Sequence, residues 1–303
     1  MSGRSFRVRA ALAQNLLASA APARALVASA RIQAGDSVYD LGAGTGLITR
    51  ELIAAGARVV AVERDANLAR KLRDRFEGRN VEVLEADMAS VAFVAPFKVV
   101  ANPPFNLTAA LLRRLLFDGP PPVLAALALQ REAARKYVGL PRETMVSLLA
   151  KPWFDLSVSE PFRRADFVPA PSDDVGLLQI ERRPVPALDE AMREPWRAFV
   201  RHGWARGKPD AWRTFRDVIS NLQWRRLSTN LGVAQSADRA SLTYAQWLGV
   251  FRFVAESAPI ARRRRAFGLR SDAHLAGADD GLRDRAGDAG DPDIARSNHR
   301  GLQ

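Results

Sequence analysis

A glycine-rich loop between an expected strand and an expected helix constrains the fold of this chain more than any other feature. Residues 37–41 have the composition of a short buried strand, and the glycines follow at alternate positions: Gly42, Gly44 and Gly46. Such glycines let the backbone approach a ligand closely, and the N-terminus of the following helix offers unpaired N–H groups. A strand, a glycine loop and a helix in this order are typical of a nucleotide-binding turn.

The loop differs from two common nucleotide-binding loops. Its glycine spacing is not the Gly-x-Gly-x-x-Gly of dinucleotide sites, and it lacks the Lys-Ser/Thr pair of a triphosphate-binding loop. It brings no cation to its ligand, and Asp40 stands near the end of the preceding strand. The pattern therefore favours a ligand with a positive centre over a triphosphate.

Three further expected strands also end at a polar side chain. These strands are expected at residues 58–62, 81–86 and 98–101, and the polar side chains that follow them are Glu63, Asp87 and Asn102. In an open α/β sheet the carboxyl ends of the strands border one crevice, so these residues and Asp40 should converge there. The sequence therefore predicts an α/β, Rossmann-like domain with its ligand at this edge.

The acids at this edge each have a functional interpretation beside an ordinary one. Glu63 follows the glycine loop by roughly 20 residues, the separation at which an acid binds ribose hydroxyls. The Asp87 carboxylate can accept from an adenine amine, and the adaptable Met88 side chain can lie against the ring. An exposed acid at the end of a strand is a common alternative for any one of them, but four strand ends in register favour a site.

The segment Asn102-Pro103-Pro104-Phe105 follows the fourth strand. The prolines stop the strand, because neither has a backbone N–H and each restricts the residue before it. We expect the resulting turn to present the Asn102 side chain, the Pro103 carbonyl and the Phe105 ring in one direction. Two acceptors beside a flat apolar surface suit a planar group with an NH2, such as adenine. Taken alone, the segment is more simply a proline turn with a capping Asn and a core Phe.

Two other segments have a similar double interpretation. The prolines of residues 167–171 hold an extended loop, and Phe167 either closes the target pocket or fills the core. Gln14 and Asn15 interrupt an Ala/Leu-rich stretch, and on their own they are more simply structural residues near the beginning of a helix.

Composition excludes several classes of chemistry. The chain contains no Cys, which removes disulfides, thiolate metal sites, Cys nucleophiles and pyrimidine methylation through a Cys adduct. Its three His are not spaced as a ligand pair, so no metal site is expected. No apolar run has the length of a membrane span, and Gln14 and Asn15 interrupt the only stretch similar to a signal peptide. We therefore expect a cytoplasmic protein without membrane association.

The net charge of +12 at pH 7 indicates a polyanionic partner, with nucleic acid as the first candidate. The alternative is a general arginine bias. The excess of basic over acidic residues is pronounced in residues 182–265, which carry 17 Lys/Arg against 7 Asp/Glu. The same residues have a helical pattern with short breaks. Most of the tryptophans there are expected in a core, and arginines between them supply a surface for phosphates: Arg201, Arg206, Arg213, Arg216, Arg225 and Arg226.

The sequence predicts three regions. Residues 1–181 form the α/β domain, and residues 182–265 form a small all-α domain. Residues 266–303 are dominated by Gly, Ala, Asp and Arg with little periodicity, which is typical of a disordered tail.

Together, the motifs resemble the S-adenosylmethionine-dependent rRNA adenine N6-methyltransferases. The resemblance is strongest to the Erm-type 23S rRNA methyltransferases, which confer macrolide–lincosamide–streptogramin resistance. The matching segments are collinear: Gln14-Asn15-Leu16-Leu17, Asp40-Leu41-Gly42-Ala43-Gly44-Thr45-Gly46, Glu63-Arg64-Asp65, Ala86-Asp87-Met88, Asn102-Pro103-Pro104-Phe105 and Phe167-Val168-Pro169-Ala170-Pro171.

The resemblance implies a class-I methyltransferase domain, an RNA-binding helical domain and S-adenosylmethionine as the cofactor. It implies cofactor contacts from these residues: Gln14, Asn15, Gly42, Gly44, Gly46, Glu63, Arg64, Asp87, Met88 and Asn102. It also implies that Asn102 and Pro103 hold the target amine, and that Phe105 and Phe167 stack on the extruded base. The expected partner is 23S rRNA, unassembled or in a precursor of the large subunit, and the protein is expected to be a monomer.

Pro103 departs from the family pattern, which usually has Ile or Leu after the Asn. Asn-Pro-Pro-Phe/Tyr is instead common in DNA adenine and protein glutamine N-methyltransferases. Three alternatives therefore stay open: a 16S rRNA adenine dimethyltransferase, a DNA adenine methyltransferase, and a non-catalytic nucleic-acid binder on the same scaffold. The intact glycine loop and Asn motif argue against the last.

Overall fold

The computed structural model describes residues 15–205, 210–234 and 236–267. These residues divide into two compact units at the Ala187–Leu188 bond. The division lies beyond the boundary predicted after residue 181, because the chain up to Ala187 still bonds to the first unit: the Ala187 N–H donates to Pro152 O (2.8 Å). The functional roles assigned to the two units stay predictions.

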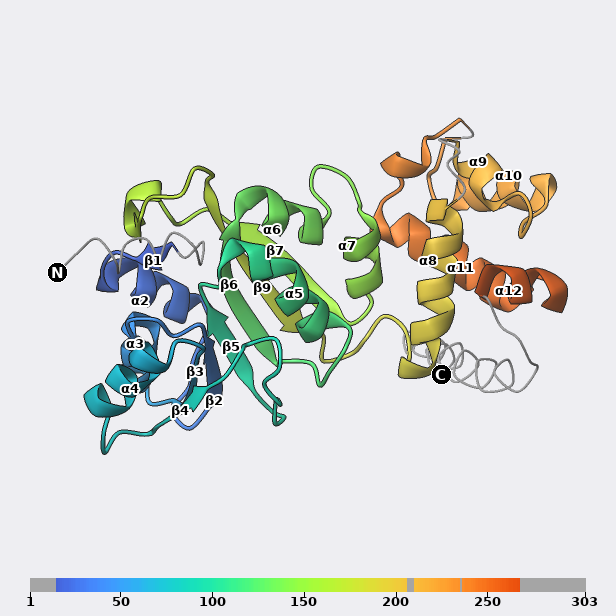
Figure 1. The fold of residues 1–303 in the computed structure, drawn as a ribbon. Helices are drawn as coiled ribbons and strands as arrows, with labels where there is room; N and C mark the ends of the chain where they lie inside the picture. The colour runs from blue at the N-terminus through green and yellow to red at the C-terminus, as the bar shows by residue number, and fades with distance from the viewer. Residues whose placement is uncertain (1–14, 206–209, 235, 268–303) are drawn as a thin grey trace, which may run out of the picture. The chain divides into compact units, whose positions relative to one another are not determined.

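The first unit is built on a seven-stranded sheet with the order β4-β3-β2-β5-β6-β9-β7 (Figure 1). The strands are β2 Ser37–Leu41, β3 Arg58–Glu63, β4 Val81–Glu85, β5 Lys98–Ala101, β6 Leu124–Gln130, β7 Phe154–Ser159 and β9 Val175–Arg182. Neighbouring strands from β4 to β6 are parallel, whereas β9 is antiparallel to both β6 and β7. This mixed, mostly parallel sheet confirms the predicted Rossmann-like α/β fold.

Helices cover both faces of the sheet. They are α2 Ala20–Ser29, α3 Leu47–Ala54, α4 Ala66–Arg75, α5 Thr108–Leu116, α6 Arg131–Val138 and the unpredicted α7 Met145–Ala150. In Figure 1, α2, α3 and α4 lie on one side of the strands, and α5 and α6 lie on the other. Burial on both faces explains why the central strands are continuously apolar: in β6 every residue from Leu124 to Leu129 is buried.

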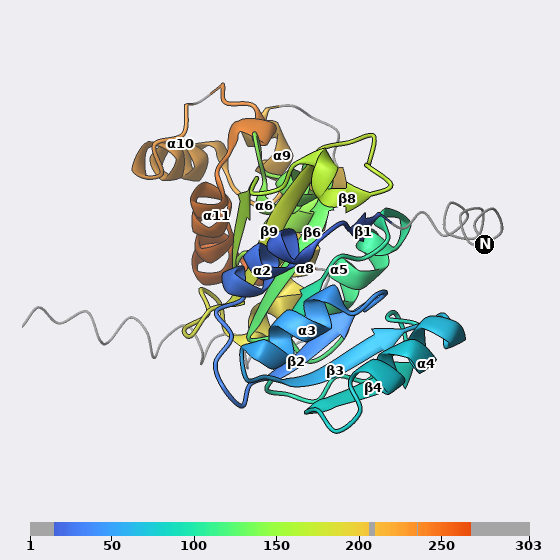
Figure 2. The same cartoon turned by 90° about the vertical axis from the view of Figure 1, so that its left-hand side faces the viewer.

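A short antiparallel pair of strands lies apart from the main sheet (Figure 2). It consists of β1 (Leu16–Leu17) and β8 (Phe167–Val168), and Leu17 stands opposite Phe167. The pair thus brings the N-terminal motif beside the Phe-Val-Pro-Ala-Pro motif, although the two are far apart in the chain. The sequence singled out both motifs but did not predict that they pair.

The second unit is helical, as predicted. Its helices are α8 Arg193–Ala205, α9 Ala211–Phe215, α10 Asn221–Asn230, α11 Tyr244–Ser257 and α12 Ile260–Phe267. Phe199 packs in its core with ring centroids 5.4 to 6.1 Å from those of Trp196, Phe215, Trp247 and Phe251. Of the tryptophans predicted to fill this core, Trp196, Trp224 and Trp247 are buried, whereas Trp204 and Trp212 are half-buried.

Helix α12 continues past residue 265, where the sequence predicts the beginning of the tail. Ala266 and Phe267 are buried, and the Phe267 ring lies 5.3 Å from that of Phe251. The predicted boundary is wrong by these two residues, because they contribute to the helical core. Residues 268–303 of the predicted tail lie outside the described residues. Within the described part of the chain, no helix is long and apolar enough to cross a membrane.

Candidate active site

The glycine loop after β2 adopts the left-handed backbone conformation that favours glycine. The φ angles are +80° at Gly42, +57° at Gly44 and +79° at Gly46, which caps α3. A Cβ at Gly46 would stand 2.7 Å from Leu72 Cδ2, so packing as well as backbone conformation requires glycine there. A Cβ at Gly42 would stand 3.1 Å from Met88 Cε. The loop therefore approaches one of the predicted adenine-binding residues.

Asp40, in β2, is fully buried. Its Oδ2 accepts from Thr49 Oγ1 in α3 (2.6 Å), whereas its Oδ1 is buried without a hydrogen-bond partner. Burial raises the pKa of Asp40 to about 7; the charge of Glu63 raises it too, and the bonds from Thr49 oppose both effects. A cation bound at the glycine loop would favour the ionised form of this carboxyl group.

Glu63, at the end of β3, is buried, and both of its carboxylate oxygens accept backbone N–H bonds. Oε2 accepts from Gly44 N–H (2.8 Å), and Oε1 accepts from Asp65 N–H (2.9 Å). These bonds join the acid to the glycine loop. Each carboxylate oxygen has two lone pairs, so acceptor capacity is left for the ribose hydroxyls predicted from the sequence.

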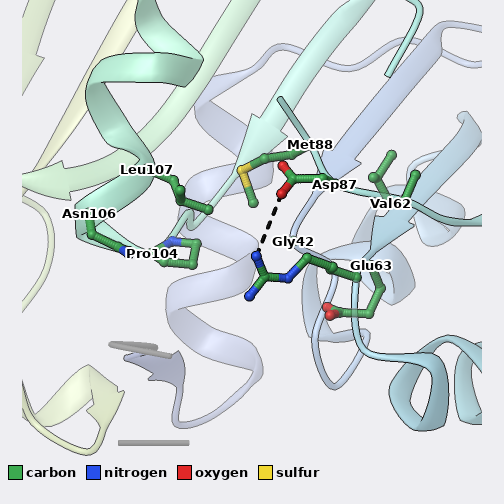
Figure 3. Close-up of a pocket in the computed structure, with 10 residues that line it drawn as sticks. Gly42, Val62, Glu63, Asp87, Met88, Pro104, Asn106 and Leu107 are labelled. Atoms are coloured by element: carbon green, nitrogen blue, oxygen red, sulfur yellow. Dashed lines mark ion pairs between the residues drawn. The ribbon is translucent and has the colours of Figure 1, made fainter. Parts of the chain in front are cut away.

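A cavity of about 140 Å³ lies at this edge of the sheet. Its lining is Gly42, Val62, Glu63, Arg64, Ala86, Asp87, Met88, Pro104, Asn106 and Leu107. Figure 3 shows Asp87 and Met88 on one side, and Pro104 and Leu107 on another. Its dashed line marks the ion pair of Arg64 Nη1 with Asp87 Oδ2 (3.6 Å). A slot with a thioether and a proline on its walls and acids at its edge fits the adenosine part of a ligand.

The Asn102 side chain is half-buried and fixed from one side. Its Nδ2 donates to the Asn15 carbonyl (2.7 Å), which identifies Oδ1 as the free end of the amide. This Oδ1 is buried and has no hydrogen-bond partner. A buried acceptor without a donor is costly unless a ligand supplies one. Asn102 therefore presents an acceptor for an N–H group of a ligand.

The other predicted base-binding residues lie in different environments. Pro103 is buried and the Phe105 ring is half-buried beside Asn102 in the chain, so Phe105 keeps a surface for contact. Phe167 is 2% exposed, and its ring packs edge-on against Phe162 at 5.8 Å between centroids. This burial favours the core-filling interpretation of Phe167. Gln14 lies outside the described residues.

Several residues that line the cavity were not singled out in the sequence: Val62, Asn106 and Leu107. Their only signal is that they adjoin the motifs, because apolar and amide side chains near a strand end are common. The contribution of Asn15 through its carbonyl was also missed, since a backbone group leaves no trace in residue type. Among the described residues, no group of three His, Asp or Glu side chains is arranged to hold a metal ion.

The chain is similar to known proteins in sequence and in structure. The model of the family described as ribosomal RNA adenine dimethylase matches residues 5–256. The chain is similar to the mycinamicin-resistance protein MyrB of Micromonospora griseorubida, with 35% identity over 240 residues, 76% of this chain and 75% of MyrB. It is 29% identical over 261 residues to ribosomal RNA small subunit methyltransferase A of Acaryochloris marina, 80% of this chain and 96% of that protein. The crystal structure of the 23S rRNA methyltransferase ErmE is similar with a TM-score of 0.74 and 27% identity, over 80% of this chain and 100% of that one.

Proposed function

The chain belongs to the ribosomal RNA adenine dimethylase family, and we propose that it transfers a methyl group from S-adenosylmethionine to N6 of an adenine in 23S rRNA. Its similarity to the 23S rRNA methyltransferase ErmE and to the mycinamicin-resistance protein MyrB supports this substrate. The proposal includes resistance to macrolides, lincosamides and streptogramin B as the consequence of the modification.

The unpaired Oδ1 of Asn102 carries the proposal. The lone pair of adenine N6 is delocalised into the ring, so the amine is a weak nucleophile. Asn102 Oδ1 and the Pro103 carbonyl would accept its two N–H groups and favour a more pyramidal, nucleophilic nitrogen. Because Asn15 holds the amide from its other end, the acceptor is oriented before the base arrives, which is the condition for electrostatic catalysis.

The cofactor would supply an electrophilic methyl group on a sulfonium centre. We assign Gly42, Gly44 and Gly46 to its methionine part, Glu63 to its ribose, and Asp87 with Met88 to its adenine. Target N6 would receive this methyl group in place of the sulfonium sulfur, and it would then release one proton to solvent. No strong base is needed before transfer, because the methylated nitrogen is cationic and acidic. Catalysis is then mainly positioning.

We infer that the substrate is 23S rRNA before assembly of the large subunit, and that the enzyme acts as a monomer in the cytoplasm. The target base must leave its stack to enter the site, and this costs least where RNA is not yet enclosed by ribosomal proteins. Phe105, with its half-buried ring, is the residue that we assign to stacking on the extruded base.

A second candidate is dimethylation of an adenine in 16S rRNA. The similarity to ribosomal RNA small subunit methyltransferase A, which covers 96% of that protein, favours it. The chemistry at Asn102 would be the same, so the two candidates differ in the RNA and not in the site.

Replacement of Asn102 tests the proposed site. Asn102→Ala removes the acceptor, and the rate of methyl transfer should fall by at least about 100-fold, the loss typical of one preorganised polar group. The dissociation constant of S-adenosylhomocysteine, measured by calorimetry, should stay close to the wild-type value. Asn67→Ala, at an exposed asparagine of α4, is the matched control and should retain full activity. Methyl transfer by Asn102→Ala at the control rate would refute the mechanism.

A further inference from the structure

Arg114, in the helix α5, binds the segment that follows β4. Its Nη1 donates to the Ala89 carbonyl, and its Nη2 donates to the Val91 carbonyl. Its guanidinium carbon lies 4.9 Å from the centre of the Phe93 ring, within the range of a cation–π contact. One side chain thus contacts three residues of the segment 86–97, which itself contains no strand or helix.

Arg113 and Arg114 are consecutive residues of α5 that lie in different environments. Arg113 is 74% exposed in its side chain and pairs with Asp118 at the end of its own helix (2.6 Å). Arg114 is instead half-buried against the segment after β4. Helical periodicity does not distinguish the two, because a long arginine side chain reaches over apolar surface to distant carbonyls.

The segment that Arg114 binds begins with a tight turn around Asp87. The Ala89 N–H donates to Asp87 Oδ1 (2.8 Å), and the Ser90 N–H donates to Asp87 O (2.9 Å). The backbone of this turn therefore fixes the direction of the Asp87 carboxylate. Because Arg114 holds the carbonyl of Ala89 inside the turn, its contact bears directly on that carboxylate.

The far end of the same segment is held from β2. The Tyr39 hydroxyl accepts from the Val94 N–H (3.2 Å), and its ring packs edge-on against Phe93 and Phe97 at 5.0 and 5.4 Å between centroids. Phe93 and Phe97 stack on each other at 4.8 Å. Tyr39 thus supports the part of the segment distant from the cavity, whereas Arg114 supports the part next to Asp87.

We propose that Arg114 is a positioning residue that holds the turn of Asp87 and Met88 in the shape that binds the cofactor adenine. The inference rests on the proposed function, since it requires Asp87 to contact that adenine. The guanidinium fork suits the task because its two N–H groups reach two carbonyls at once, which the single ammonium of Lys does less well. Arg114 acts through Asp87 and touches neither the target base nor the RNA.

Arg114→Met and Arg113→Met form a matched pair, because each removes one positive charge from α5. Arg114→Met should raise the dissociation constant of S-adenosylhomocysteine, measured by calorimetry, by roughly tenfold. It should raise the KM for S-adenosylmethionine similarly and leave kcat and the KM for RNA unchanged. Arg113→Met should bind S-adenosylhomocysteine like the wild type. Wild-type affinity in Arg114→Met, or equal losses of cofactor and RNA affinity, would overturn the proposal.

A conservative variant separates positioning from folding. Arg114→Lys keeps the charge and one bond to a carbonyl, so its loss of cofactor affinity should lie between those of the wild type and Arg114→Met. Thermal unfolding of each variant without ligand reports the folded fraction. If Arg114→Met does not fold, Arg114→Lys carries the test, and wild-type cofactor affinity in that variant would refute the proposal.

A double-mutant cycle with Asp87→Asn shows whether Arg114 acts through Asp87. The loss of affinity for S-adenosylhomocysteine in the double variant should be smaller than the product of the two single losses. If the loss in the double variant equals the product of the two single losses, Arg114 acts independently of Asp87. This result would overturn the inference and leave the proposed site intact. Wild-type affinity in Asp87→Asn alone would instead refute the adenine-binding role of Asp87, and with it the premise of the inference.

Discussion

Asp40 is a carboxyl group held where its neutral form is favoured. Full burial raises its pKa from 3.8 to about 7. A group whose pKa is higher in the folded than in the unfolded chain stabilises the fold below the unfolded pKa, and this contribution is lost as the pH rises through the folded pKa. The free energy of unfolding should therefore decrease from about pH 4 to about pH 7 through Asp40.

Asp40→Asn isolates this contribution, because the amide is neutral at every pH of interest. Urea unfolding of both proteins, at one pH below and one above the Asp40 transition, should show that the wild type loses more stability than the variant as the pH rises. Equal losses in the two proteins would show that Asp40 does not titrate in this way.

Single residues could be predicted where a strand end defined their position. Glu63 ends β3, and Asp87 and Asn102 come after β4 and β5. These strands belong to the parallel part of the sheet, so their carboxyl ends lie at the same edge. The burial of Phe167 and the contacts of Arg114 could not be predicted. Both depend on partners distant in the chain, and an aromatic ring or an arginine fits a core, a binding site or a surface equally well.

At the scale of elements, the glycine loop contains a position, Gly46, where both backbone conformation and packing oppose a side chain. Gly46 and Gly78 both have positive φ, but a Cβ meets Leu72 at 2.7 Å only at Gly46, and at Gly78 it meets nothing within 4 Å. Gly78→Ala should therefore lower the free energy of unfolding by about 1 kcal/mol, through backbone strain alone. Gly46→Ala should lower it by about 3 kcal/mol, because overpacking is added to strain. Urea unfolding measures both; equal losses would show that packing against α4 is not limiting.

Elements with a strong local pattern were predicted closely, and those without one were missed. The buried strands β2 and β5 have their predicted bounds, because an apolar run bordered by turn residues defines a strand locally. The strands β1 and β8 have two residues each and form only because they pair with one another. The helix α7 has six residues and no periodicity to detect.

At the scale of the whole molecule, the net charge of +12 predicts a strong dependence of RNA binding on salt. Arg225 and Arg226 are exposed on α10 of the second unit. Arg225→Gln and Arg226→Gln should each reduce the slope of log affinity against log salt by about 1, and weaken binding to unrelated RNAs similarly. Fluorescence anisotropy over a salt series measures the slopes.

Arg197→Gln is the control for these variants, since it changes the net charge equally. Arg197 pairs with Glu194 (3.1 Å), so its charge is already compensated on α8. In Arg197→Gln, the slope of log affinity against log salt should change less than it does in Arg225→Gln and Arg226→Gln. The same slope in all three variants would show that net charge, and not the surface of α10, determines RNA binding.

The types of the two units could be predicted from the sequence, but the order of the strands and the exact boundary between the units could not. Alternating strands and helices indicate a Rossmann-like sheet, and the shift in composition after residue 182 indicates a separate helical unit. The antiparallel insertion of β9 between β6 and β7 could not be derived, because strand order in a sheet depends on pairing between distant segments. The exact division at Ala187 also depends on such contacts, here with Pro152.

The proposed activity is methyl transfer to N6 of an adenine in 23S rRNA. In the most direct measurement, the purified protein is incubated with labelled S-adenosylmethionine and one nucleic acid at a time: 23S rRNA, 16S rRNA or duplex DNA. The nucleosides of each product are then analysed for label. We expect label in N6-methylated adenosine from 23S rRNA alone. Label only in 16S rRNA would show that the substrate is the RNA of the small subunit. Label only in DNA, or in no nucleic acid, would contradict the proposed function.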